Sequence, residues 1–137
     1  MLNLYQVAPG TVVAQFETAP ISRFTLALFC GASGDHNPVH VDLDFARAAG
    51  YKDVFAQGML VMAYLGRLLP RPDSSVRVES FTCRFLTVTQ VGDSLRCVAR
   101  LASREELNHQ LRVALDLESR TLDGVLRATG SATVIAR

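Results

Sequence analysis

The segment Met59–Leu69 constrains the fold most strongly, because it is apolar on nearly every side. Its sequence is Met-Leu-Val-Met-Ala-Tyr-Leu-Gly-Arg-Leu-Leu, so Arg67 is its first charged residue, and Pro70 then closes a helix at this point. A helix on a protein surface shows a polar face, whereas this segment has none before Arg67. We therefore predict a buried helix that the rest of the chain must surround.

Four segments in the second half of the chain, from about Val76 onward, are predicted to be β-strands. Apolar and polar residues alternate there with a period of two, which is typical of strands with one buried face. Three apolar rows follow this alternation: Leu95, Cys97, Ala99 and Leu101; Leu111, Val113, Leu115 and Leu117; and Leu126, Ala128, Gly130, Ala132 and Val134. Ser119 to Gly124 is a predicted turn, with Asp123-Gly124 as its strongest signal.

Three further features of the strands carry predictions. In Val76–Phe85 the apolar phase switches, from Val76 and Val78 to Phe81, Cys83 and Phe85, which indicates a β-bulge. The small residues at the centre of the last strand suggest that a thick element, such as a helix, packs closely there. The first and last strands are expected to be sheet edges that need covering.

The first half of the chain supplies one more strand and two short helices. Thr11–Thr18 is the predicted strand, and Ser22 to about Gly31 and Leu43–Ala49 are the predicted helices, the second with Asp42 as N-cap and Gly50 as C-terminal cap. Short connections imply that neighbouring strands are antiparallel. We predict the α+β class and a single domain over residues 1–137, in which a curled antiparallel five-stranded sheet wraps around the central buried helix.

Composition and charge exclude several classes of function. The 14 basic and 13 acidic residues are scattered along the chain without a basic stripe, so no nucleic-acid partner is expected. Gly58–Gly66 is the longest strongly apolar stretch and is too short to span a bilayer. Met1–Gly10 lacks the basic start and apolar core of a signal peptide. Cys30, Cys83 and Cys97 lie in apolar runs and are interpreted as reduced, small buried residues, which favours a cytoplasmic location.

The segment Ser33–Asp42 concentrates groups that can accept, donate or transfer protons, and its polar, Gly and Pro content predicts a loop. Pro38 stiffens the loop, so Asp35 and His40 can be directed towards one point. A carboxylate beside an imidazole is suited to general acid–base chemistry on water, and Asn37 can orient a group without taking its proton. Asp and Asn are also common loop formers, so composition alone leaves a purely structural role open.

No metal site is expected from the three histidines. His36 and His40 alternate along the loop, but a metal would need further ligands. The remaining histidine, His109, lies inside a strand pattern.

Gly58 lies at the start of the predicted buried helix, after Gln57. The first turn of a helix has unpaired amide hydrogens and a partial positive charge. Gly58 has no side chain to block approach, so its amide could donate to a developing oxyanion. The alternative is that Gly58 only permits the turn into the helix.

These residues together resemble the MaoC-like family, which includes the R-specific (type 2) enoyl-CoA hydratases. The family pattern S-G-D-x-N-P-x-H-x-D is matched by Ser33, Gly34, Asp35, Asn37, Pro38, His40 and Asp42. A second element matches Gln57-Gly58-Met59-Leu60, and a third matches Arg84-Phe85 and Gly92-Asp93. The chain departs from the pattern at Gln57, where many members carry His, and at Val88, where Pro is usual; the first change is expected to affect local hydrogen bonding.

The resemblance implies a hot dog fold and a hydratase or dehydratase. It implies that Asp35 and His40 hold and activate water, that Asn37 orients it, and that the Gly58 amide binds the thioester carbonyl. The implied reaction is reversible addition of water to a trans-2-enoyl thioester, giving an (R)-3-hydroxyacyl thioester. No cofactor is implied beyond the CoA or acyl-carrier thioester of the substrate itself. Arg84 could approach a phosphate of that carrier, although an ion pair on the sheet surface is the favoured interpretation.

Two other functions stay open, a hot dog acyl-CoA thioesterase and a non-catalytic acyl-thioester-binding subunit of a dehydratase complex. The resemblance also implies a homodimer or higher homo-oligomer. The carrier and the acyl chain length are left undetermined, because pocket depth is expected to depend on the packing of Leu60, Met62 and Leu65.

Overall fold

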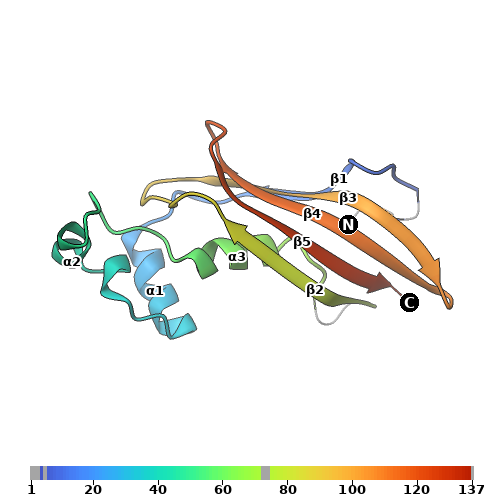
Figure 1. Ribbon diagram of the computed structural model, residues 1–137, viewed down its shortest axis with the longest axis horizontal. Coiled ribbons are helices and arrows are strands. Elements are labelled where there is room, and N and C mark those ends of the chain that lie inside the picture. Colours follow the sequence, from blue (N-terminus) through green and yellow to red (C-terminus); the bar gives the residue numbers. More distant parts are fainter. Residues whose placement is uncertain (1–3, 5, 72–74, 137) are drawn as a thin grey trace.

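The dominant element of the computed structural model is a five-stranded sheet (Figure 1), and the described residues are 4, 6–71 and 75–136. The strands are β1 (Val12–Glu17), β2 (Val76–Phe85), β3 (Leu95–Leu107), β4 (Gln110–Thr121) and β5 (Leu126–Ala136). All four pairings are antiparallel, in the order β1-β3-β4-β5-β2. The predicted antiparallel five-stranded sheet is confirmed.

Two of the helices, α1 (Arg23–Ser33) and α2 (Leu43–Ala48), begin at capping side chains. The third is α3 (Gly58–Gly66), and one 3₁₀ turn spans Pro38–His40. The Ser22 hydroxyl accepts a hydrogen bond from the Thr25 amide, and the Asp42 carboxylate accepts one from the Phe45 amide. Asp42 is thus confirmed as the N-cap of α2. Gly50, the predicted C-terminal cap, follows α2 and has a left-handed φ of 94°.

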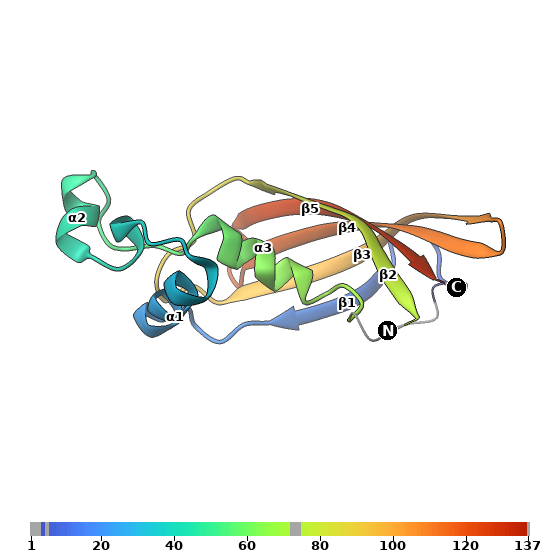
Figure 2. The same cartoon turned by 90° about the horizontal axis from the view of Figure 1, so that it is seen from below.

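The core lies between α3 and one face of the sheet. Figure 2 shows α3 lying along the sheet, and its residues Leu60, Val61 and Leu65 are buried. The apolar rows predicted in β3 and β4 are also buried, and they are Leu95, Cys97, Ala99, Leu101, Leu111, Val113, Leu115 and Leu117. The two faces therefore bury each other's apolar groups, as the α+β prediction requires.

The prediction that α3 is buried on all sides is wrong. Met59 is 53% exposed and Ala63 is also exposed, because one sheet covers only one side of a helix. The helix also ends at Gly66 rather than Leu69. The Leu68 and Leu69 amides bond to carbonyls three residues earlier, so the chain leaves α3 through tight turns.

The edges of the sheet are β1 and β2, whereas β5 lies between β4 and β2. The prediction that the last strand is an edge is therefore wrong, because β2 pairs with β5 and not with β3, its successor in the chain. Most side chains of β2 are exposed. The predicted bulge in β2 is confirmed by a register shift between Val78 and Ser80.

Gly130, at the centre of β5, is small for a reason other than the one predicted. A Cβ at this position would lie 2.5 Å from the carbonyl oxygen of Thr82 in β2. The close neighbour is thus the backbone of the adjacent strand and not a packed helix.

Two hairpin turns connect the last three strands. The predicted turn at Asp123-Gly124 is confirmed, with Gly124 at φ 98°, but β4 continues to Thr121, so the turn begins later than expected. Asn108 and His109 form the other turn, with φ values of 51° and 61°. Two successive positive φ values are typical of a type I′ hairpin turn, so the placement of His109 inside a strand is wrong.

The cysteines behave largely as predicted. Cys30 and Cys97 are buried, Cys83 is partly exposed, and all three are free thiols. Burial raises the pKa of the Cys97 thiol to about 12, which disfavours the reactive thiolate. None of the helices in the described part of the chain is long and apolar enough to cross a bilayer.

Candidate active site

The loop after α1 is shaped by hydrogen bonds between residues close in sequence. The Asp35 amide donates to the Ser33 hydroxyl (3.2 Å), and the Asn37 amide donates to Asp35 Oδ1 (3.3 Å). The Val39 amide donates to Asn37 Oδ1 (3.2 Å), which caps the 3₁₀ turn that begins at Pro38. Such side-chain turns are what Ser, Asp and Asn commonly form, and here they fix the backbone that carries Asp35 and His40.

His40 is held in one orientation by the segment before α3. Its Nδ1 lies 2.8 Å from the carbonyl oxygen of Phe55, and its ring packs edge-on against the Phe55 ring at 5.1 Å. Because a carbonyl oxygen can only accept, Nδ1 carries the proton in this contact. In the neutral ring Nε2 is then an acceptor, so this nitrogen is free to take a proton.

Asp35 and His40 are brought together, although they do not bond directly. Asp35 Oδ2 lies 3.6 Å from His40 Nε2, which is longer than a hydrogen bond. The histidine side chain is 9% exposed and the aspartate side chain 39% exposed. The pair therefore has a buried, fixed member and a member that is partly exposed to solvent.

Asn37 lies within the same loop and acts on its shape. Its side-chain Oδ1 accepts from the Val39 amide, and its backbone amide donates to the Asp35 carboxylate, while its backbone carbonyl accepts from the His40 amide (3.2 Å). Asn37 thus connects the two members of the Asp35–His40 pair through the loop backbone. Its role in orienting water stays a prediction.

Gly58 is the first residue of α3, so its amide has no acceptor within the helix. The preceding residue, Gln57, is fully buried and donates from Nε2 to the Leu26 carbonyl (3.1 Å) and to the Cys30 thiol (3.2 Å). Gln57 therefore ties the start of α3 to α1, which is a local hydrogen-bonding role. A Cβ at Gly58 would lie 3.3 Å from the Phe85 ring, so the missing side chain keeps this helix end close to β2.

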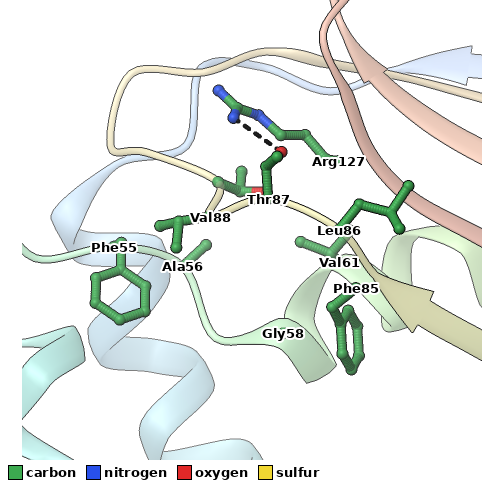
Figure 3. A pocket seen from close by; sticks show the side chains of 10 residues that line it. Phe55, Ala56, Gly58, Val61, Phe85, Leu86, Thr87, Val88 and Arg127 are labelled. Carbon is green, nitrogen blue, oxygen red and sulfur yellow. Dashed lines mark hydrogen bonds between the residues drawn. The ribbon is translucent and has the colours of Figure 1, made fainter.

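A pocket of about 310 Å³ opens beside Gly58 (Figure 3). It is lined by Phe55, Ala56, Gly58, Val61, Phe85, Leu86, Thr87, Val88, Thr89 and Arg127. Asp35 and His40 do not line this pocket. Phe55 connects the pocket with the Asp35–His40 pair, because it lines the pocket and its carbonyl oxygen accepts the hydrogen bond from His40 Nδ1. Leu60, Met62 and Leu65 do not line this pocket either; the α3 residues that line it are Gly58 and Val61.

The sequence interpretation missed Phe55 and Arg127. Arg127 forms a partly buried ion pair with Asp93 of the third motif, a pairing that the sequence did not predict. No ion pair of Arg84 occurs among the described residues. The Gly92-Asp93 motif had marked Asp93, but nothing local in the sequence identified Arg127 as its partner.

Within residues 4, 6–71 and 75–136, no group of three or more His, Cys, Asp or Glu side chains is placed to hold a metal ion.

Comparison with known proteins places these features in a family context. The sequence profile described as MaoC like domain matches residues 5–121. An (R)-specific enoyl-CoA hydratase of Rhodospirillum rubrum is 35% identical over 79 residues, which cover 55% of this chain and 54% of that protein. The chain thus spans about half the length of this relative. The 3-hydroxyacyl-thioester dehydratase Z of Mycobacterium tuberculosis is 27% identical over 133 residues, covering 93% of this chain and 79% of that protein.

Solved structures share the architecture. An unliganded R-hydratase from Pseudomonas aeruginosa superposes with a TM-score of 0.82 at 27% identity, over 96% of this chain and 83% of that one. An (R)-hydratase from A. caviae gives a TM-score of 0.83 at 22% identity, over 96% of this chain and 98% of that one. These similarities confirm the hot dog fold that the sequence resemblance implied.

Proposed function

Because the chain belongs to the MaoC-like dehydratase family, we propose that it catalyses the reversible hydration of trans-2-enoyl thioesters to (R)-3-hydroxyacyl thioesters. The observation that carries this proposal is the Asp35–His40 pair, with 3.6 Å between Oδ2 and Nε2. Residues of the same types match the family motif, and the names of the related hydratases and dehydratases support this type of reaction.

In this proposal, one water molecule lies beside the pair and reaches both side chains. Carboxylate Oδ2 and neutral Nε2 are both acceptors, so a water about 2.8 Å from each can donate one hydrogen to each of them. Its lone pair is then free to attack C3 of the enoyl group. His40 takes the proton released as the C3–O bond forms, and the Asp35 carboxylate stabilises the resulting imidazolium.

The negative charge that develops on the thioester oxygen needs a donor. In this proposal the Gly58 amide donates to that oxygen, and the positive end of α3 adds a favourable field. Transfer of the proton from the His40 imidazolium to C2 completes the addition of water and regenerates neutral His40. The apolar walls of the neighbouring pocket provide a surface for the acyl part of the substrate.

Purified protein is expected to hydrate crotonyl-CoA, because its enoyl group presents the reacting carbons of the proposed substrate class. Loss of the enoyl absorbance measures hydration, and a thiol reagent measures free CoA in a parallel sample. Hydration without CoA release supports the hydratase. Release of CoA without hydration would favour the thioesterase, and neither reaction on a series of enoyl-CoA chain lengths would favour a non-catalytic subunit.

We further propose that the protein forms a homodimer through α3 and the edge strand β2. Met59 on α3 and Val78 and Phe85 on β2 are 53%, 40% and 48% exposed, which leaves apolar surface beside an unpaired edge. Val78→Asp is expected to convert a dimer into monomers in sedimentation experiments, because it places a charge in this surface. Leu107→Asp, a matched change at an exposed residue at the far end of β3, should leave the dimer intact; a monomeric wild type would contradict the proposal.

A further inference from the structure

The ion pair between Arg127 and Asp93 differs from the other arginine–carboxylate pairs of the described residues by its burial. Its side chains are 14% and 20% exposed, whereas the arginines of the other pairs are 43% to 54% exposed. Arg127 Nη2 lies 2.8 Å from Asp93 Oδ2. A partly buried pair is much less screened by solvent than a surface pair, so its geometry can matter to the structure around it.

The pair fixes the segment 86–93, which forms one wall of the pocket. Arg127 Nη1 donates to the Thr87 hydroxyl (3.2 Å), as the dashed line in Figure 3 shows, and the Thr87 hydroxyl donates to the Leu126 carbonyl (2.9 Å). At the other end of the segment, Asp93 Oδ2 also accepts from the Gln90 amide (2.9 Å). One guanidinium therefore holds both ends of the segment.

The fixed segment in turn holds the backbone that orients His40. The Ala56 amide donates to the Thr89 carbonyl (2.9 Å), and Phe55 and Gln90 form an antiparallel bridge. The Phe55 carbonyl is the acceptor for His40 Nδ1. Gly58 follows in the same stretch of chain, so both proposed catalytic groups depend on where this stretch lies.

We propose that Arg127, through Asp93, is a positioning residue for His40 and Gly58, an inference that rests on the proposed hydratase function. Arg127 hydrogen-bonds to Asp93 and Thr87, and to neither member of the Asp35–His40 pair. Its planar guanidinium reaches two acceptors at once, which a lysine ammonium on a single flexible stem does not reproduce. Displacement of reacting groups by about 1 Å can lower a rate about a hundredfold, so a modest shift of the segment is sufficient.

The kinetic test compares Arg127→Met with Arg96→Met in crotonyl-CoA hydration. Arg96 pairs with Glu17 at 2.7 Å on the exposed surface and serves as the matched control. Arg127→Met is expected to lower kcat by about ten- to a hundredfold with little change in KM, while Arg96→Met leaves both unchanged. The kcat of Arg127→Lys should lie between those of the wild type and Arg127→Met. This variant provides the test if Arg127→Met does not fold.

Two kinetic outcomes would overturn the proposal. Unchanged kcat in folded Arg127→Met or Arg127→Lys would show that the pair does not position the catalytic groups. A raised KM with unchanged kcat would make Arg127 a binding group instead.

A measurement that needs no activity separates this inference from the proposed function. The side-chain ¹⁵N resonances of the histidines report which ring nitrogen carries the proton, and His40→Ala identifies the His40 signals. We expect the Nδ1-protonated form of His40 in the wild type and in Arg96→Met, and a mixture of the two neutral forms in the Arg127 variants. If the wild type is inactive but the His40 signals differ between it and the Arg127 variants, the hydratase function is rejected and the positioning role is retained. If the His40 signals are unchanged in the Arg127 variants, the positioning role is rejected.

Discussion

Replacing Asp35 with Asn is expected to lower kcat for enoyl-thioester hydration by about a hundred- to ten-thousandfold, the range typical of general acid–base groups. The amide keeps the shape of the carboxylate but loses the charge that stabilises a protonated His40. Because the Asp35 side chain is 39% exposed, the change should have little effect on folding. Turnover is measured by loss of enoyl absorbance, and folding by circular dichroism and thermal unfolding of the same samples.

His40→Ala should lower kcat within the same range, since it removes the proposed base. It also leaves the Phe55 carbonyl without its imidazole donor, which we expect to reduce stability by about 1–3 kcal/mol. His36→Ala is the matched control, because His36 is exposed in the same loop. Near wild-type turnover in Asp35→Asn or His40→Ala would contradict the assigned roles, as would an equal loss in His36→Ala.

Gly130→Ala is expected to reduce the free energy of unfolding by about 1–3 kcal/mol. The new Cβ would lie 2.5 Å from the Thr82 carbonyl oxygen, and the obstacle is backbone that no rotamer change can remove. The contact between β2 and β5 must therefore open locally. Urea denaturation at equilibrium measures the change.

Gly31→Ala provides the opposite expectation for the same substitution. Gly31 lies within α1, and a Cβ there would meet nothing within 4 Å. Alanine in a helix interior is more favourable than glycine by about 0.5–1 kcal/mol, so stability should rise.

A Gly130→Ala protein as stable as the wild type would show that the β2–β5 contact relaxes without cost.

Part of the candidate site could be predicted because local sequence carries the information for it. Asp35, Asn37 and His40 lie within six residues, and short-range hydrogen bonds shape their loop, so a motif could identify them together. Phe55 and Arg127 were missed for the opposite reason. Their roles arise from partners 15 and 34 residues away in sequence, His40 and Asp93, and no local pattern specifies those pairings.

The sequence by itself determined the type of each strand and α-helix, because the alternation of a strand and the cap of a helix depend on near neighbours in the chain. The apolar rows of β3 and β4 and the cap at Asp42 are of this kind. Only the tertiary structure decided that β2 pairs with β5, that α3 keeps one face exposed, and that Gly130 is small to admit the neighbouring strand. These features depend on which distant surfaces meet, and many pairings are compatible with the same apolar pattern until packing and backbone hydrogen bonding select one.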